Sequence, residues 1–223
     1  MTEPSSRRQR LLSAGNRLFS KWGYDKTSVD EIAAEAGVSK GGVYLEFADK
    51  DALFKAVVHD AFATYADDWL RRFTADPGDW SFARMFQHSL AAMNATPLVK
   101  ALLTRDTRIY GTFLRREPEL LAMTQSARSD FFGQMQAAGA MRRDIPAPVL
   151  AQLMTLIGYG FVAGMETLPT GSSVPLEESL RGLALLLDRG LADPERSNPV
   201  AARALIEGMT IQVRDALRSA PPP

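Results

Sequence analysis

The hydrophobic periodicity of the chain constrains its fold more than any other feature. Apolar residues recur with the roughly 3.6-residue period of an α-helix in nearly every segment, as with Leu11, Ala14, Leu18 and Phe19. We find neither the strict alternation of a half-buried strand nor a repeat of fixed length. The sequence therefore predicts an all-α fold, in which a compact three-helix head precedes a larger helical body.

Breaks rich in proline and glycine separate the expected helices. The first helix is expected over residues 5–23, the second over 27–37, the third over 39–46, and a long fourth from about Asp49. Further helices are expected near residues 80–95, 97–115, 117–138, 146–167, 176–191 and 198–219. Thr27 and Ser28 are candidate N-caps of the second helix, with Glu31 placed for a capping box. Gly37 is expected to end that helix.

Composition narrows the class of protein. The 223 residues carry 26 basic and 26 acidic side chains, so any nucleic-acid contact must come from a local patch. The chain has no cysteine, which suits a reducing cytoplasm, and its N-terminus lacks the apolar region of a secretory signal. The apolar run "VLAQLMTLIGYGFVAGM" contains a glutamine and three glycines, and we expect a buried helix there, with no membrane partner.

The sequence offers little material for catalysis. Only two histidines occur, His59 and His88, and neither has a metal-ligand partner one helical turn away. No phosphate-binding loop, nucleophile elbow or zinc-protease motif is present. We therefore expect no enzyme, no catalytic residue, no metal site and no cofactor.

The stretch "AGVSKGGVYLEF" is the most informative motif. Two adjacent glycines stand where the pattern requires a helix, although each costs roughly 0.5–1 kcal/mol relative to alanine. If Val43 and Phe47 point inward, Gly41 and Leu45 point outward. The helix then presents a ridge that carries few side-chain atoms, which suits close approach to a flat partner.

Lys40, Gly42 and Tyr44 occupy the shoulders of that ridge. The short elements and the glycine-containing turn before it have helix-turn-helix spacing, in which the second helix enters the DNA major groove. Glycine there would let backbone N–H groups approach phosphates and base edges closely. The alternative is that the glycines mark a loop and Tyr44 belongs to the core.

The run "LFSKWGYDKTSVDEIAAEAGVSKGGVYLEFADKDALFKAVV" resembles the N-terminal domain of TetR-type transcriptional repressors. The resemblance covers roughly the first 60 residues, and beyond it the chain is similar only in helical character and length. It implies contacts to the DNA backbone by Thr27, Ser39, Lys40, Tyr44 and Lys50. Base reading would then fall to the outward-facing set of Gly41, Gly42 and Leu45, the leucine meeting a thymine methyl group.

Two features of the head keep alternatives open. Glu46 either forms a salt link with Lys50 or accepts a hydrogen bond from cytosine N4. Arg7, Arg8 and Arg10 form either an arm that reaches the minor groove or a merely solvated N-terminus. DNA binding would also require the acids Asp30, Glu31 and Glu35 to face away from the duplex.

The resemblance also implies a homodimer that binds two half-sites and is released by a small molecule. We therefore divide the chain into a DNA-binding domain, residues 1–52, and an effector-binding and dimerisation domain, residues 53–223. Candidate dimer contacts come from two apolar segments that would pair in a four-helix bundle: Gly160, Gly164, Leu183 and Leu187. The alternative is that both segments pack within one chain.

Aromatic residues and methionines gather in the middle helices, where they either form ordinary core or line a cavity for an apolar effector. The candidate effector residues are Tyr65, Trp69, Phe86, His88, Tyr110, Phe113, Phe131 and Met135. Possible polar anchors are His88, Arg105, Arg108 and Tyr110.

Together these features predict a cytoplasmic repressor that binds double-stranded DNA at a near-palindromic operator. A small, largely apolar effector would release it by favouring a conformer with misaligned heads. The alternatives are an activator, and a ligand-binding or protein-interaction module without operator binding.

Overall fold

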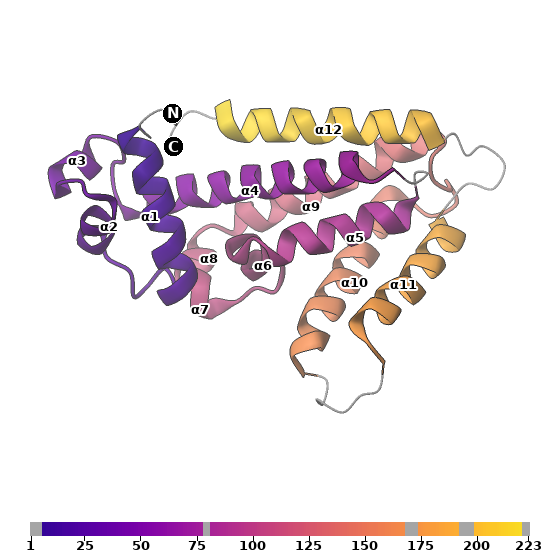
Figure 1. Ribbon diagram of the computed structural model, residues 1–223, viewed down its shortest axis with the longest axis horizontal. Helices are drawn as coiled ribbons and strands as arrows, with labels where there is room; N and C mark the ends of the chain where they lie inside the picture. The colour runs from indigo at the N-terminus through magenta and orange to yellow at the C-terminus, as the bar shows by residue number, and fades with distance from the viewer. Residues whose placement is uncertain (1–5, 78–80, 168–173, 192–198, 220–223) are drawn as a thin grey trace. The chain divides into compact units, whose positions relative to one another are not determined.

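The computed structural model describes residues 6–77, 81–167, 174–191 and 199–219, and within these ranges every regular element is a helix (Figure 1). The helices are α1 (Arg7–Trp22), α2 (Val29–Ala36), α3 (Lys40–Tyr44), α4 (Lys50–Ala75), α5 (Phe82–Asn94), α6 (Pro97–Leu103), α7 (Thr107–Tyr110), α8 (Phe113–Arg116), α9 (Pro118–Ala137), α10 (Ala147–Thr167), α11 (Leu176–Leu191) and α12 (Pro199–Ser219). The predicted all-α fold is confirmed.

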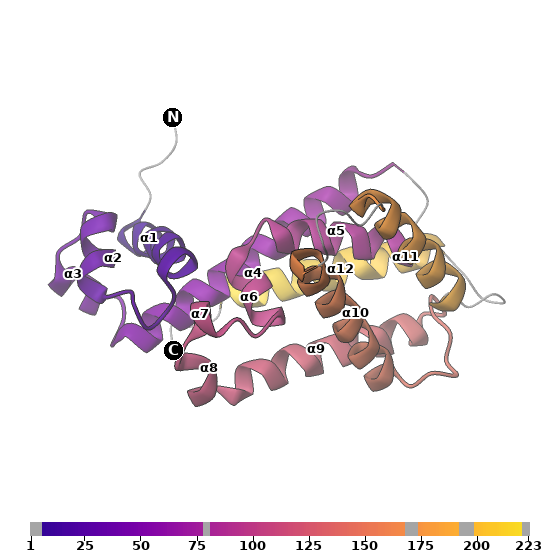
Figure 2. The same cartoon turned by 90° about the horizontal axis from the view of Figure 1, so that it is seen from below.

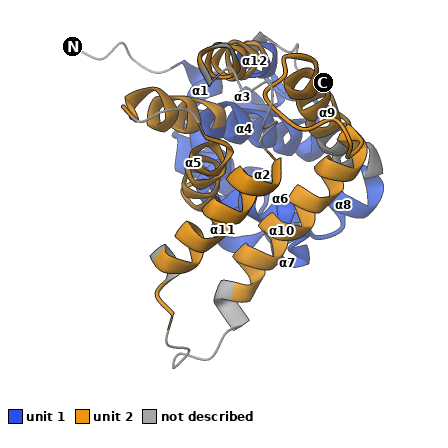
Figure 3. Cartoon of the chain, turned by 90° about the vertical axis from the view of Figure 1, so that its right-hand side faces the viewer, with its two compact units in different colours: residues 1–65, 96–118, 213–223 blue, residues 66–95, 119–212 orange. Residues whose placement is uncertain are grey.

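The chain forms two compact units, which Figure 3 distinguishes by colour. Unit 1 contains residues 1–65, 96–118 and 213–223, and unit 2 contains residues 66–95 and 119–212. These units are defined by packing, and the functional boundary that we expected after residue 52 stays a prediction. Helices α6 to α8 belong to the same unit as the head, because α6 and α7 pack against α1.

The first helices end at the residues that their sequences indicate. Ser28 caps α2 by accepting a hydrogen bond from the Glu31 N–H, and the Glu31 carboxylate accepts one from the Ser28 N–H, which completes the predicted capping box. Gly37 ends α2 in the left-handed conformation, with φ of 63°. Figures 1 and 2 show α1, α2 and α3 gathered in one group.

The single helix expected over residues 97–115 is wrong, since three short helices occupy that segment. Arg105 has a φ of 51°, and Asp106 then caps the start of α7 by accepting from the Arg108 N–H. Gly111 ends α7 with a φ of 54°, a conformation that favours glycine. These two positions interrupt the helical hydrogen bonding although the apolar period continues through them.

Aromatic rings form the centre of unit 1. Phe54 packs edge-on against Phe19, Tyr110 and Phe113, with ring centroids 4.7–5.5 Å apart. The Tyr110 hydroxyl donates to the Leu98 carbonyl at 3.0 Å, so its polar group is satisfied inside the core. This cluster attaches α7 and α8 to the head and to the first half of α4.

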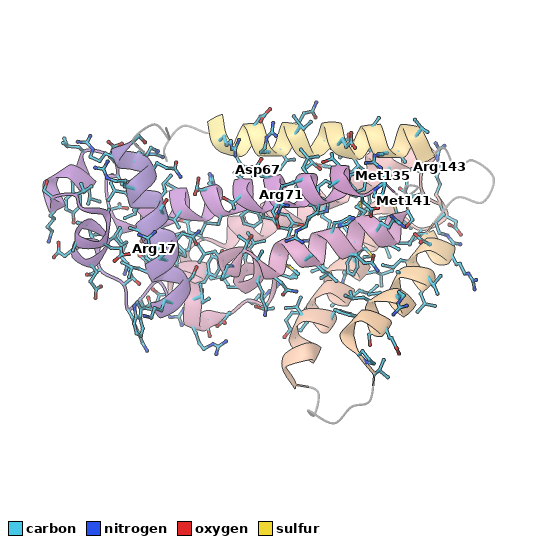
Figure 4. All side chains as sticks on the ribbon, in the orientation of Figure 1. Arg17, Asp67, Arg71, Met135, Met141 and Arg143 are labelled. Carbon is cyan, nitrogen blue, oxygen red and sulfur yellow. The ribbon has the colours of Figure 1, made fainter. Side chains whose placement is uncertain are left out.

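Unit 2 has its own core. Helix α11 packs against α5, and the Asp188 carboxylate accepts from the Ala83 N–H at 2.9 Å, at the start of α5. The Trp69 indole donates to the Met85 carbonyl at 3.2 Å. Met135 and Met141, both labelled in Figure 4, are fully buried.

Helix α10 departs from the buried helix that we expected. Its segment Ala147–Gly164 is long and apolar enough to cross a membrane by length and composition, yet only 28% of that segment is buried within the chain. Val149, Leu153 and Leu156 are exposed along one side of the helix. Figures 1 and 3 show α10 and α11 lying side by side. The chain itself therefore leaves much of the apolar surface of α10 uncovered.

Candidate functional site

Helix α3 follows the turn after α2 and is anchored at both ends. The Ser39 hydroxyl accepts from the Gly42 N–H at 3.1 Å and so caps the start of α3. Val43 and Phe47 are buried, as the sequence predicts, and fix which side of α3 faces the core. This rotation leaves the opposite side of the helix toward solvent.

We name the outward side of this helix the α3 edge, formed by Gly41, Tyr44 and Leu45. Leu45 is 75% exposed and Tyr44 is 48% exposed. Gly41 is exposed as well, and a Cβ built there would meet no atom within 4 Å. The α3 edge is therefore a narrow surface on which an apolar residue and a hydroxyl project beside bare backbone.

Gly42 does not belong to this surface, although we expected it to read bases. It is buried, and a Cβ built there would lie 2.7 Å from Val38 Cγ1 and 3.3 Å from the Ser39 hydroxyl. The turn that precedes α3 folds back over this side of the helix. Glycine is therefore needed at position 42 for close packing inside the head.

Thr27 also differs from its expected role as a phosphate ligand. Its side chain is only 2% exposed, and its hydroxyl donates to the Gly23 carbonyl at 2.8 Å. The threonine thus joins the end of α1 to the start of α2 from inside. Ser28, the next residue, takes the capping position at the surface.

The two lysines of the expected site have different surroundings. Lys40 is exposed at the start of α3, where its ammonium lies 2.9 Å from the Asp30 carboxylate, and this hydrogen bond raises the pKa of Lys40. Lys50 lies with its Nζ 4.2 Å from the centre of the Tyr24 ring. Burial lowers the pKa of Lys50. Lys40 is therefore the more accessible cation for a phosphate.

The acidic residues of the head do not all face away from α3. Asp30 lies beside its start, paired with Lys40. The Ser28 hydrogen bonds occupy the Glu31 carboxylate and lower its pKa. Glu35 pairs with Arg17, which Figure 4 labels on α1, at 3.0 Å. The condition that all three acids face away from the duplex is thus not met by Asp30, although Asp30 and Glu35 are each paired with a basic side chain.

Arg7, Arg8 and Arg10, for which we left open an arm or a solvated N-terminus, lie in the first turn of α1. Glu46 pairs with Arg7 at 2.6 Å, which also replaces the salt link expected to Lys50. The Arg8 guanidinium lies 4.6 Å from the centre of the Phe47 ring. Arg10 donates to the Ala36 carbonyl at 3.3 Å, at the end of α2.

The sequence reasoning missed how unit 1 holds the end of α1. Gly23 has a φ of 83°, and a Cβ there would lie 1.9 Å from the Arg108 carbonyl oxygen. The Tyr24 N–H donates to the Ile109 carbonyl at 2.7 Å, and the Tyr24 hydroxyl bonds to the Asp51 carboxylate. Burial, followed by the Asp51 bond, raises the pKa of Tyr24. The sequence signal was Gly23, which we interpreted only as a helix end.

The candidate effector residues are divided between the two units. Tyr110 and Phe113 are buried in the aromatic core of unit 1, and Tyr65 is half-buried in the same unit. The other candidates belong to unit 2: Trp69, Phe86, His88, Phe131 and Met135. The expected anchor Arg108 is occupied by Asp106 at 2.8 Å. Tyr110 and Phe113 thus follow the core alternative.

Within unit 2, His88 has a carboxylate partner. Its Nε2 lies 2.9 Å from the Asp76 carboxylate, and its ring lies edge-on to Phe73. Trp69 stacks on Phe73, with ring centroids 5.1 Å apart. Phe131 contacts Phe132 edge to face. His88 therefore pairs with a carboxylate beside the aromatic pair of Trp69 and Phe73, and Phe131 belongs to a separate ring contact.

The candidate dimer residues are also placed unequally. Gly160 is exposed, and a Cβ on Gly160 or Gly164 would meet no atom within 4 Å. Leu187 is only 6% exposed, so this residue packs within its own chain instead of forming the expected outer surface. Leu185 and Leu186 are exposed on α11. The leucine run "LALLL" holds more leucines than one buried helix side accommodates, which is the signal that we overlooked.

The head of the chain matches a family model, and longer stretches of the chain are similar to individual known proteins. Residues 11–57 match the model of the bacterial regulatory proteins of the tetR family. The chain is 29% identical over 165 residues to the HTH-type transcriptional repressor Rv1474c of Mycobacterium tuberculosis, over 73% of this chain and 84% of that protein. It is 27% identical over 207 residues to the regulator AcrR of Shigella flexneri, over 88% and 95% of the two chains.

A solved structure extends the likeness in fold to most of the chain. The transcriptional regulator FadR of Bacillus subtilis, in complex with stearoyl-CoA, superposes with a TM-score of 0.58 at 14% identity, over 81% of this chain and 97% of that one. The helix-turn-helix geometry, the family match over the head and the curated relatives agree. Residues 11–57 therefore match the helix-turn-helix domain of the tetR family, and the chain is similar over most of its length to HTH-type transcriptional repressors and regulators.

Proposed function

We propose that this regulator is a ligand-responsive repressor that binds double-stranded DNA as a homodimer at a near-palindromic operator. The α3 edge carries the proposal, because it exposes a leucine and a tyrosine beside a glycine with open space above it. Such a surface is costly in water and suits the major groove, which admits a helix closely. We expect the protein to act in the cytoplasm, where its DNA lies.

The proposed DNA contacts follow the exposure of the side chains. Leu45 would meet a thymine methyl group, and Gly41 would let the backbone approach a base edge. Tyr44, Ser39 and Lys40 are exposed and would bind phosphates. Thr27, Gly42 and Lys50 are left out, because the first two are buried and the third lies over the Tyr24 ring.

The homodimer is proposed from the exposed apolar sides of α10 and α11. We define the α10–α11 face by Leu153, Leu156, Tyr159, Leu185 and Leu186, all of which are exposed. Gly160 would allow a partner helix to approach α10 closely. Pairing this face with its copy forms a four-helix bundle related by a two-fold axis. A two-fold protein recognises two inverted half-sites, hence a near-palindrome.

The effector is proposed to be small and largely apolar, and to bind within unit 2. Trp69, Phe86 and Met135 are buried within that unit, and Phe131 is half-buried there. FadR of Bacillus subtilis, which shares the fold, binds stearoyl-CoA, a ligand with a long apolar chain. Since α4 is continuous from Lys50 to Ala75 and supplies residues to both units, we propose that it carries the population shift.

Selection of duplexes from a random library tests DNA binding. The wild-type protein is expected to enrich an inverted repeat and to lose affinity steeply as salt rises. Tyr44→Phe is expected to weaken binding to all selected duplexes by about 3–10-fold, whereas Leu45→Ala changes the base preferred at one position. A protein without duplex binding would be an interaction module, and selected DNA that raises transcription when bound would indicate an activator.

Thermal unfolding in the presence of candidate ligands tests the effector. Fatty acids, their thioesters and aromatic compounds of similar size would be compared at equal concentration. A true effector stabilises the folded protein and weakens its binding to the selected duplex at the same concentrations. Stabilisation by polar metabolites alone would contradict an apolar effector.

A further inference from the structure

The side chains of Arg7 and Glu46 join the start of α1 to the turn that follows α3, the proposed recognition helix. Arg7 donates from Nε at 2.8 Å and from Nη2 at 2.6 Å, both to Glu46 Oε1. The Glu46 side chain is 21% exposed and the Arg7 side chain 43%. Glu46 directly follows Leu45, so the carboxylate that holds the guanidinium belongs to the residue next to the α3 edge. Both N–H groups occupy the same carboxylate oxygen, Oε1.

The Arg7 side chain passes beside Gly42. A Cβ on Gly42 would lie 3.8 Å from Arg7 Cδ, in van der Waals contact, as well as against Val38. Gly42 is not among the glycines with positive φ, so the backbone does not require a glycine there. The requirement is steric and comes from Val38, whereas the Arg7 side chain passes at ordinary contact distance from this position.

Two neighbouring contacts hold the first turn of α1 in place. Arg8 lies over the Phe47 ring, and Arg10 donates to the last carbonyl of α2. Ser6 caps α1 by accepting from the Gln9 N–H at 3.1 Å. Arg7 therefore projects from a backbone that is fixed against both helices of the motif.

The magnitude of the interaction argues against a purely stabilising role. An exposed ion pair of this kind contributes only about 0–1 kcal/mol to stability. The pair has another effect, because an unpaired carboxylate beside the α3 edge would repel phosphates. Guanidinium carries five N–H donors, so Arg7 can hold Glu46 and still donate to a phosphate oxygen.

We propose that Arg7 is a phosphate-binding residue and that Glu46 is its positioning residue. Glu46 holds the guanidinium beside the α3 edge. Arg7 then contacts a phosphate next to the bases that face Gly41 and Leu45. Glu46 itself reads no base. The inference rests on the proposed DNA binding and adds to it a residue of α1 outside the recognition helix.

A double-mutant cycle on the tightest duplex selected by the wild-type protein tests the pair. Arg7→Ala is expected to weaken binding about tenfold and to lower the salt slope by about one unit per protomer. Glu46→Ala is expected to weaken binding about 3–5-fold, although it removes a negative charge, because Arg7 loses its orientation. The double variant should bind like Arg7→Ala alone. Arg7→Lys should keep the salt slope but lose the coupling to Glu46.

The pair Arg17–Glu35 provides the matched control, since it also joins α1 to the motif by one arginine and one glutamate. A double-mutant cycle on Arg17 and Glu35 should leave the salt slope of DNA binding unchanged. Thermal unfolding checks that every variant is folded. Tighter binding by Glu46→Ala, or additive effects of the two substitutions, would overturn the positioning role. A changed base preference in Glu46→Gln would instead make Glu46 a base-reading residue.

Failure of the proposed DNA binding would give a different result from failure of the Arg7–Glu46 proposal. If the wild-type protein selects no duplex, both proposals fall. If it selects a palindrome and responds to Tyr44→Phe, but shows no coupling between Arg7 and Glu46, only this inference falls.

Discussion

The α3 edge and the α10–α11 face both expose leucines to solvent, yet their surroundings differ. Leu45 stands beside bare glycine backbone and is bordered by a lysine, a tyrosine hydroxyl and the Arg7–Glu46 pair. Leu156, at 58% exposure, continues instead into further apolar residues on its own helix and on α11. The first surface suits a hydrated, charged partner, and the second suits an apolar copy of itself. The residues around an exposed leucine therefore determine which kind of partner its surface suits.

The largest effect is expected when the apolar face receives a charge. Leu156→Asp should raise the dissociation constant of the proposed homodimer on the order of 100-fold, since central interface residues contribute about 2–4 kcal/mol. Sedimentation at several concentrations measures this change. The monomer should stay folded, because the side chain is exposed.

Two matched variants sharpen this prediction. Val200→Asp, at an exposed position on α12, should leave assembly unchanged. Leu187→Asp should unfold the chain instead, because Leu187 is buried within it. If Leu156→Asp leaves the dimer intact, the α10–α11 face is not the interface.

The two adjacent glycines test the other surface. Gly42→Ala should destabilise the head by about 1–3 kcal/mol, because the new methyl group would press on Val38. Gly41→Ala should stabilise it by up to about 0.5–1 kcal/mol, since that position is open and helical. Urea unfolding of both variants measures the difference. Equal effects on stability would contradict the assignment of Gly42 to packing and Gly41 to the surface.

A smaller effect is expected when the negative charge of Asp30, beside the start of α3, is removed. Asp30→Asn should free Lys40 for a phosphate and remove a repulsive carboxylate, so that DNA binding tightens about 2–5-fold. Binding at several salt concentrations measures the change. Glu207→Gln, which neutralises an acid on α12, is the control and should have no effect. Weaker binding by Asp30→Asn would indicate that Asp30 orients Lys40 for its contact.

The smallest effect concerns the capping box of α2. Hydrogen bonds from Ser28 lower the pKa of Glu31 in the folded protein. Its contribution to stability is therefore present above the unfolded pKa of about 4.3 and is lost as pH falls through the lower folded value. Glu31→Gln should lower thermal stability slightly at neutral pH and converge with the wild type at lower pH. Parallel curves across this range would contradict the role of the carboxylate.

Local sequence patterns predicted the head well, because the interactions that define it are short in range. The capping box of Ser28 and Glu31 and the left-handed Gly37 each depend on neighbours within a few residues. The inward side of α3 followed from the spacing of Val43 and Phe47. The outward exposure of Leu45 then required no knowledge of the rest of the chain.

Contacts between distant residues decided the remainder. The sequence by itself determined the all-α class, most helix limits, the resemblance of the head to the tetR family and the exposed leucine of α3, since periodicity and capping act along one helix. Only the tertiary structure decided that Gly42 serves packing, that Thr27 faces inward and that Arg7 reaches Glu46, 39 positions along the chain. The same holds for Tyr110, which joined the core of unit 1 instead of a pocket. Burial and ion pairing depend on which helices meet, and helical spacing does not encode that choice.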